Sequence, residues 1–345
     1  MVRQSAFVFI KPHAVTPSCE SLVEASLKSK GISVTSTGTI SSDVIDSSKL
    51  IDQHYYAIAS KATLLKPSEL NVPAEKFQEK FGVSWASVLA KGQAYNAADA
   101  CKHFGVDAAG LDKLWGAAKK DGKLVKFGGG FYCGLVKDIY VFNGFFMSMR
   151  SRFTEPGKCI KYYVVEWDSK QLSWESFRGE VLGPTDPADA PADSLRGQIM
   201  AKWKSLGLAT EPNTGDNGVH ASASPFEALA EKMNWLGVKC QEDAFGKAML
   251  DAGIPMKTIE AWSVDPQVTY GAKSMPIKKS IFDTLEDTDA DYCLSLCMMV
   301  NGASAAPAAS PSGSSGSCPV PYPHYTIGAG GVLLGFLIGA LLLSK

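Results

Sequence analysis

Hydrophobic and polar positions switch between strand-like and helix-like patterns from the start of the chain. Residues 6–10 form a continuous apolar run, which is typical of a strand buried on both faces. Pro17 predicts the first position of a helix that Gly31 ends, and residues 32–40 predict a second strand. A further helix, apolar on one face, is expected to begin at Asp46.

The pattern changes between residues 64 and 153. Several short helical patterns follow one another, and an alternating apolar stretch comes after the glycines 128–130. The expected helices span 73–81, 85–90, 97–104 and 110–119, and the alternating stretch spans 139–149. We therefore interpret residues 64–153 as an inserted subdomain made of helices and then a hairpin.

The earlier pattern resumes after the insertion and predicts strand, helix, helix, strand and helix. The expected elements are 159–167, 173–182, a helix from Asp193 to about 206, 217–222, and a helix opened by the capping box 224–227. Without the insertion, this order suits an α+β fold in which helices cover one face of a ferredoxin-like antiparallel sheet.

The end of the chain has a composition of its own. Residues 238–300 predict a helical C-terminal extension, with helix over 243–262 and less regular structure after it. Residues 301–323, rich in Ala, Ser, Gly and Pro, predict a flexible linker. The stretch 325–343 has no charge and nearly the roughly 20 residues that a membrane span needs. We expect a transmembrane tail anchor with the main domain in the cytosol.

Composition mainly excludes other classes of protein. The 345 residues allow two domains or one domain with a large insertion. A formal net charge of −1 gives no basic field for nucleic acid. The closest pair among the eight cysteines, Cys293 and Cys297, lacks a zinc-site spacing, so we expect free thiols in a reducing compartment.

Among the five histidines, His220 has the most favourable setting for chemistry. It lies on a short predicted strand directly before a capped helix, and its neighbours Val219, Ala221 and Ser222 are small. Small neighbours leave room for a bulky ligand at the imidazole. A histidine with a pKa near neutrality can act as a nucleophile without a separate base.

Residues 217–222 (Asn-Gly-Val-His-Ala-Ser) resemble the active-site signature of nucleoside diphosphate kinases. That signature reads Asn, two apolar residues, His, Gly or Ala, Ser and Asp. Four further segments resemble motifs of the same family, in the family's order: 11–15, 54–55, 182–189 and 194–197. The resemblance covers about residues 5–63 and 159–236, which predicts a nucleoside diphosphate kinase-like domain over 1–237, interrupted by the insertion.

The resemblance implies a covalent phosphate transfer with four catalytic residues. His220 would attack the terminal phosphate of a nucleoside triphosphate, and the phosphohistidine would then pass its phosphate to a nucleoside diphosphate. Glu231 would accept a hydrogen bond from the imidazole, and Ser222 would help to orient Glu231. Tyr55 would pack beside the histidine from the facing helix.

The resemblance also implies a nucleotide site. Lys11 and Arg196 would neutralise the phosphates, and Thr185 would donate to the second phosphate. Asn217, together with Lys11, would hold the sugar hydroxyls. Mg²⁺ is expected to bridge the nucleotide phosphates and to have no ligands from the protein. The expected partners are nucleoside di- and triphosphates, and the family's assembly makes a homo-oligomer possible.

Two departures from the family's motifs keep an alternative open. Ala223 stands where the family has Asp. Gly179 stands where the family has an arginine, and Arg178 lies one position earlier. A shift of one residue rotates a helical side chain by about 100°, although a local bulge would restore its direction. The alternative is a weak or inactive nucleotide-binding or scaffolding module anchored to a membrane.

Overall fold

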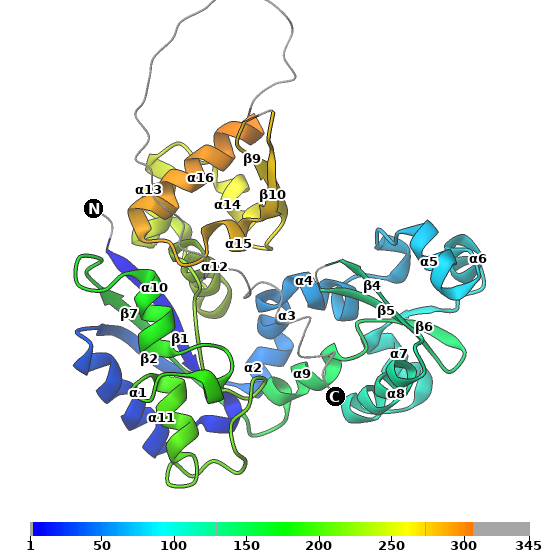
Figure 1. Cartoon of the computed structure of the whole chain (residues 1–345), viewed down its shortest axis with the longest axis horizontal. Helices are drawn as coiled ribbons and strands as arrows, with labels where there is room; N and C mark the ends of the chain where they lie inside the picture. The colour runs from blue at the N-terminus through cyan, green and yellow to red at the C-terminus, as the bar shows by residue number, and fades with distance from the viewer. Residues whose placement is uncertain (1–2, 129, 273, 306–345) are drawn as a thin grey trace, which may run out of the picture.

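The computed structural model describes residues 3–128, 130–272 and 274–305. These residues form three packed regions, which Figure 1 shows as a sheet with helices, a second region to one side and a helical region above. The core sheet is antiparallel throughout, and the predicted α+β class is confirmed.

The core sheet has four strands in the order β2-β7-β1-β8. They are β1 (Gln4–Ile10), β2 (Ser33–Ser41), β7 (Cys159–Trp167) and β8 (Val219–Ala221). With the helices between them, and the segment between β2 and β7 set aside, the chain runs β-α-β-β-α-β, as in ferredoxin-like sheets. The insertion thus lies within the segment that connects two neighbouring antiparallel strands, β2 and β7.

Helices cover the first face of this sheet. They are α1 (Pro17–Ser29), α10 (Trp174–Ser176), the π-helical turn Phe177–Leu182 that continues α10, and α11 (Leu195–Lys202). Thr16 caps α1 by accepting from the backbone N–H of Cys19 at 3.1 Å. The cap of α11 is Ser194 and not Asp193 as predicted, because the Ser194 hydroxyl accepts from Gly197 N–H. The side chain of Asp193 instead pairs with Lys30.

Helices also cover the second face, so the expectation of helices on one face is wrong. They are α2 (Ser42–Ser47), α3 (Leu50–His54), α9 (Phe146–Thr154) and α12 (Pro225–Leu236). The reason lies in β1, whose Phe7 and Phe9 point away from α1 and are fully buried. Large apolar side chains on both faces of a strand require cover on both sides.

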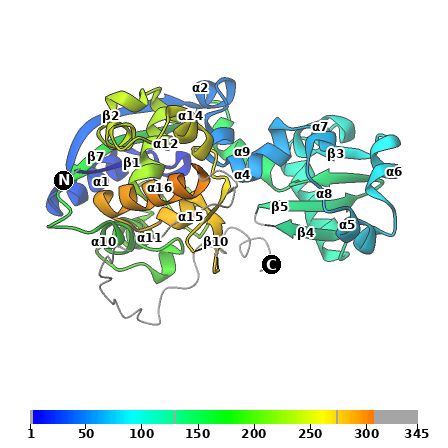
Figure 2. The ribbon, with the colours of Figure 1, turned by 90° about the horizontal axis from the view of Figure 1, so that it is seen from above.

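The insertion has its own sheet, in the order β3-β6-β5-β4, and lies to one side of the core (Figure 2). Its elements are α4 (Tyr56–Ala59), a π-helical turn (Ser60–Leu64), α5 (Ala74–Phe81), α6 (Trp85–Ala90), β3 (Ala94–Asn96), α7 (Ala97–Phe104), α8 (Ala108–Lys120), β4 (Leu124–Gly128), β5 (Phe131–Val136) and β6 (Ile139–Phe142). The predicted helices are thus present, and a hairpin follows them.

The alternating stretch 139–149, interpreted as part of the hairpin, is a strand only as far as Phe142, because the chain turns at Asn143 and continues as α9. Asn143 has a left-handed backbone with φ of 46° and is fully buried. Its side-chain amide donates to the carbonyls of Ile58 and Gly130 and accepts from Tyr132 N–H. This buried amide ties the hairpin to α4 and fixes where the strand ends.

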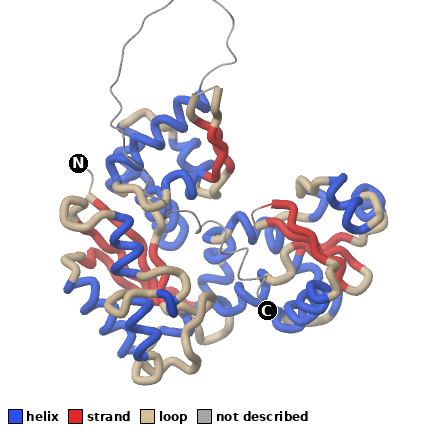
Figure 3. The backbone as a smooth tube through the Cα atoms, in the orientation of Figure 1, coloured by secondary structure: helices blue, strands red, loops and turns tan. Residues whose placement is uncertain are grey.

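The C-terminal extension packs on α12, as the separate helical cluster in Figure 3 shows. It contains α13 (Ala244–Asp251), α14 (Met256–Trp262), the hairpin β9 (Gln267–Tyr270) and β10 (Ile277–Ser280), α15 (Ile281–Leu285) and α16 (Ala290–Ala305). The segment predicted as less regular is therefore a hairpin and two helices, and α16 runs into the predicted linker. Phe226 and Leu229 of α12 belong to the core of the extension.

The predicted tail anchor 325–343 lies outside the described residues, as does most of the predicted linker. Within residues 3–128, 130–272 and 274–305, no helix has the length and apolar character to cross a membrane. The membrane tail and the cytosolic location stay predictions from the sequence.

Candidate active site

His220 lies at the middle of β8, next to β1 and under α12. Its register partner is Phe9 on β1, and the two rings stack with centroids 4.7 Å apart and planes at 27°. The imidazole side chain is 17% exposed, so it is sheltered but reachable. Gly218, with φ of +86°, turns the chain into β8, and a Cβ there would meet Ile199 at 2.8 Å.

A short chain of hydrogen bonds holds the imidazole from one side. Glu231 Oε1 lies 2.6 Å from His220 Nε2, and Ser222 Oγ donates to Glu231 Oε2 at 2.5 Å. Ser222 Oγ in turn accepts from Phe7 N–H at 3.0 Å, which ties the chain to β1. Glu231 reaches the strand because Ser224 and Pro225 start α12 directly after β8. The three residues are brought together as the resemblance implies, and His220 Nδ1 has no hydrogen-bond partner among the described residues.

The residue that packs against the imidazole is His54 and not Tyr55. The rings of His54 and His220 have centroids 4.7 Å apart at 81°, and Trp235 Nε1 donates to His54 Nδ1 at 3.3 Å. Tyr55 touches His54, with centroids 4.5 Å apart, and its phenol faces Arg196 closely enough to affect the pKa of that guanidinium. The physical reason is that α3 ends at His54, so the next side chain points elsewhere.

Burial and nearby cations keep both imidazoles neutral. Burial, followed by the charges of Lys11, Arg196 and Arg178, lowers the pKa of His220 well below its usual 6.5. Burial, followed by His220, lowers the pKa of His54 to about 3. A neutral imidazole keeps a lone pair on one nitrogen, so His220 is ready to act as a nucleophile.

We expect long-range ¹H–¹⁵N spectra to detect this neutral state. At pH 8, His220 should give the signals of the tautomer protonated at Nε2, with an unprotonated Nδ1, because Glu231 faces Nε2. His220 should remain neutral well below pH 6.5, and His54 should titrate only near pH 3, since burial lowers the pKa of both imidazoles. An imidazolium signal from His220 at pH 6 would contradict the assignment.

Arg196 presents a guanidinium without a carboxylate partner in the part of the chain that the structure describes. Arg196 is the second residue of α11. Its guanidinium donates to the backbone carbonyls of Val219, at 3.0 and 3.3 Å, and Gly183, at 2.8 Å. Burial, followed by the charge of Arg178, lowers the pKa of Arg196 to about 9. A buried cation held only by carbonyl oxygens is a favourable site for an anion.

Lys11 supplies a second such cation, directly after β1. Its Nζ donates to Gly215 O at 3.2 Å and forms no ion pair with a described carboxylate. Burial, followed by Arg196, lowers the pKa of Lys11 to about 7, while Asp216 opposes the shift. Asp216 is itself paired with Arg152 at 2.6 Å, so it is only partly available to Lys11.

Asn217 and Thr185 line the same side of the site. Asn217 is buried, and its Nδ2 donates to the backbone carbonyl of Thr185 at 2.9 Å. Its Oδ1 is also buried and finds no hydrogen-bond partner among the described residues. A buried acceptor without a donor calls for an explanation, and a hydroxyl group of a bound ligand would provide one.

Arg178 is a further cation of the site that the sequence left in doubt. Residues Phe177–Leu182 form a π-helical turn, in which Gly183 N–H bonds to Arg178 O five residues back at 3.1 Å. The extra residue in the turn is the local bulge that offsets a one-residue shift. The charge of Arg178 reaches His220, Arg196 and Glu231 and affects the pKa of each.

One cluster of possible metal ligands lies at the site, and its chemistry does not suit Mg²⁺. His54, His220 and Glu231 offer ligand atoms within 4.8 Å of one another. Two of these ligands are imidazoles, whereas Mg²⁺ prefers six oxygens. The nitrogen-rich set therefore does not fit Mg²⁺, which is expected to enter with the phosphates of a nucleotide.

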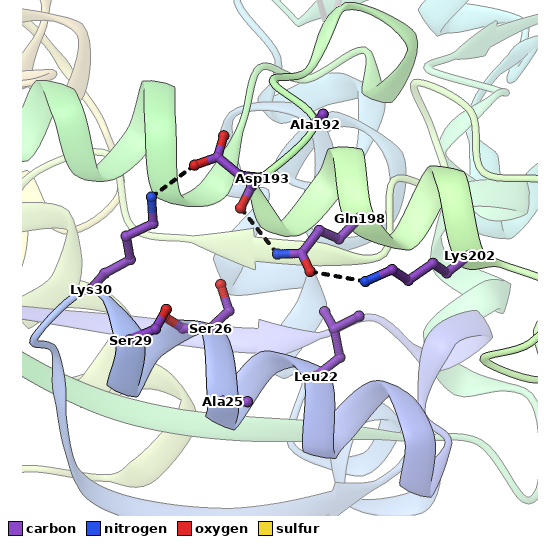
Figure 4. Close-up of a pocket in the computed structure, with 9 residues that line it drawn as sticks. All are labelled: Leu22, Ala25, Ser26, Ser29, Lys30, Ala192, Asp193, Gln198 and Lys202. Atoms are coloured by element: carbon purple, nitrogen blue, oxygen red, sulfur yellow. Dashed lines mark hydrogen bonds and ion pairs between the residues drawn. The ribbon is translucent and has the colours of Figure 1, made fainter.

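A hollow that lies away from His220 has no chemical groups of this kind. It has a volume of about 830 Å³. Figure 4 shows that its lining residues come from α1, α11 and the loop before α11. Lys30 and Asp193 pair across it at 2.9 Å, and Leu22 and Ala25 line its base. It contains neither a histidine nor a thiol, so we place the chemistry at His220.

Known proteins resemble this chain only distantly. A nucleoside diphosphate kinase of Encephalitozoon cuniculi without ligand has 13% identity and a TM-score of 0.34, and the alignment covers 69% of this chain and 90% of that chain. An NDP kinase of Pyrobaculum aerophilum has 16% identity and a TM-score of 0.33, with 68% of this chain and 95% of that chain covered. No family model and no curated protein matches the chain. Similarity at this level carries no functional argument, so the function must be argued from the site.

Proposed function

We propose that the chain is a nucleoside diphosphate kinase that carries phosphate on His220. One observation supports this most directly. The neutral imidazole is held at Nε2 by Glu231. Among the residues that the structure describes, its Nδ1 has no hydrogen-bond partner, and the nearby cations Lys11 and Arg196 have no ion-pair partner. Hydrolysis of an ester or amide would call for oxyanion-hole donors rather than several cations, whereas phosphate transfer needs cations around the moving group.

In the proposed reaction, the lone pair on Nδ1 attacks the terminal phosphorus of a nucleoside triphosphate. The N–P bond forms, the P–O bond to the diphosphate breaks, and the diphosphate leaves with the electron pair. A second nucleoside diphosphate then attacks the phosphohistidine and reverses these steps. Glu231 balances the positive charge that develops on the ring, because it faces the protonated Nε2 throughout.

Lys11 and Arg196 would neutralise the phosphate oxygens. Arg196 is buried and Lys11 is half-buried, and neither forms an ion pair with a carboxylate among the described residues. A phosphate would therefore gain a strong interaction with each of them in a site of low dielectric constant. The Asn217 Oδ1 would accept from a sugar hydroxyl, and the Thr185 hydroxyl would donate to the second phosphate. Mg²⁺ bound to the nucleotide phosphates would neutralise further negative charge.

The proposal predicts where the phosphate is found. After incubation with labelled ATP and Mg²⁺, the protein should carry an acid-labile, alkali-stable label that peptide mapping places on His220. The phosphate should be on Nδ1, because Glu231 occupies Nε2. Phosphohistidine isomers differ in ³¹P NMR shift and in antibody recognition, so the atom can be identified.

No label, or an acid-stable label such as phosphoserine at Ser222, would contradict the kinase. Nucleotide binding without any label would favour the alternative, a nucleotide-binding module that has lost its activity. The same protein sample can be tested for both, by calorimetric titration with ADP and by labelling.

A further inference from the structure

The loop between α15 and α16 of the C-terminal extension contacts the turn that follows β8, next to Ser222. In this loop, Asp287 N–H donates to Ala223 O at 2.9 Å, one residue after Ser222. The carboxylate of Asp289 accepts from Trp174 N–H at 2.8 Å. Ala290 N–H donates to Gln4 Oε1 at 3.0 Å. These bonds fasten the loop to β1, α10 and the turn that follows β8.

The same loop holds Arg178. Glu286 Oε1 and Asp287 Oδ1 each lie 2.7 Å from Arg178 Nη1. We propose that Glu286 and Asp287 are positioning residues for phosphate transfer, which hold the Arg178 guanidinium beside His220 so that it binds the transferred phosphate. This inference rests on the proposed kinase activity, and it gives the extension a role in that activity.

The geometry indicates that Glu286 and Asp287 position the Arg178 guanidinium and do not block its binding of a phosphate. Both carboxylates bind the same nitrogen, Nη1, and Arg178 Nε is buried without a hydrogen-bond partner among the described residues. An arginine binds a phosphate best through two nitrogens on one edge. The Nε edge therefore remains for the ligand while the acids fix the opposite corner of the guanidinium.

The acids also keep Arg178 charged. Burial would lower its pKa, but the charges of Asp287 and Glu286 outweigh this effect and raise the pKa above its ordinary value. The positive charge still acts on the site, since it contributes to the lowered pKa of His220. The two carboxylates thus hold the cation without removing its influence on the imidazole.

The loop between α15 and α16 is held in one conformation by its surroundings. Asp287 has a left-handed backbone with φ of 60°, which is costly outside glycine and persists only where the surroundings enforce it. Phe226 and Leu229 of α12 are part of the extension's own core. The helix that carries Glu231 is therefore continuous with the unit that carries the two acids.

The test uses the double variant Glu286→Gln/Asp287→Asn in the full chain. Both changes keep the shape and remove the charge, and asparagine tolerates the left-handed backbone at position 287. We expect single-turnover formation of phosphohistidine on His220 to slow by about tenfold to a hundredfold, because the guanidinium loses its fixed position. Asp251→Asn, in the same unit and paired with Lys247 on the surface, is the matched control and should keep the wild-type rate.

A mutant cycle with Arg178→Gln shows whether the acids act through Arg178. If they do, Arg178→Gln slows the reaction by at least as much, and adding the double variant to it causes no further loss. A merely structural role would instead give additive losses with a lowered melting temperature, and this would overturn the inference. If the double variant does not fold, the single variants decide, with an expected loss of a few fold each.

Failure of the inference can be told from failure of the proposed function. If the wild type forms phosphohistidine and the acid variants form it equally fast, the positioning role is wrong. If the variants react faster, the acids block Arg178 and the inference is again overturned. If the wild type forms none, the kinase proposal itself fails, and the role of Glu286 and Asp287 in it fails too.

Discussion

Replacing His220 with alanine is expected to lower the rate of phosphate transfer by about 10⁴-fold or more, because the only proposed nucleophile is removed. Nucleotide binding should change by no more than a few fold. The cations that would hold the phosphates come from other elements, Lys11 after β1 and Arg196 on α11. A steady-state assay of triphosphate formation and a calorimetric titration with ADP measure the two quantities separately.

The matched control is His103→Ala. His103 lies on α7 of the insertion, where its ring contacts Tyr95 with centroids 4.7 Å apart. This variant should keep the wild-type rate. Melting curves of both variants check the fold, since His220 also stacks on Phe9. Phosphate transfer by a folded His220→Ala chain at more than about one hundredth of the wild-type rate would mean that another group carries the phosphate.

The sequence was sufficient for those features that depend on neighbouring residues. The apolar run of β1 and the capping residues Thr16 and Ser224 are local signals, and the structure has all three elements where these signals predict them. The contact of His220 with Glu231 is also nearly local. A strand that leads directly into a capped helix brings a residue eleven positions later back to the strand.

Other features of the site depend on the fold and could not be read from a local pattern. The direction of Arg178 depends on one extra residue within a helical turn, and no composition signal marks a π-turn. Its partners Glu286 and Asp287 are 108 and 109 positions away in the sequence. In the same way, the choice between His54 and Tyr55 depends on where α3 ends, which patterns locate only to within a few residues.

The end of the hairpin in the insertion and the second half of the extension were missed for a related reason. The alternation over 139–149 is the pattern of a strand, but the buried amide of Asn143 ends it by bonding to a residue 85 positions earlier. Such a tertiary bond overrides a local propensity because a buried polar group needs its partners. The hairpin β9–β10 is short and half exposed, so its alternation is weak.

Replacing Lys11 with methionine is expected to lower kcat/KM at pH 7 by about 10²- to 10³-fold, because the variant loses a half-buried cation that would lie next to the transferred phosphate. Methionine has a similar length and no charge, so the packing around β1 should be kept. The larger consequence is for pH dependence. Lys11 has a pKa of about 7 without ligand, so the folded chain holds the proton below pH 7 and releases it above.

A bound polyphosphate favours the charged form of Lys11 and raises its pKa, so binding above pH 7 must take up a proton. Wild-type affinity for the Mg²⁺ complex of a triphosphate should therefore be greatest below pH 7 and fall about tenfold per pH unit above it, until the pH reaches the pKa of the bound state. Calorimetry in buffers of different ionisation enthalpy should detect uptake of nearly one proton at pH 8. In Lys11→Met, both the uptake and this part of the pH dependence should be absent.

The variant Lys11→Arg keeps the positive charge at position 11 but does not release a proton near pH 7. Arginine stays protonated through this range, so a variant that fits should bind with little loss at pH 7 and lack the alkaline fall. Glu231 adds an acidic limb to the pH profile of kcat/KM. Burial raises its pKa to about 7, and the ionised carboxylate is needed to face His220 Nε2. The wild type should therefore show a bell-shaped kcat/KM profile, of which Lys11→Arg removes only the alkaline limb. If that limb stays in Lys11→Arg, the proton belongs to another group and Lys11 is not the cation that meets the phosphate.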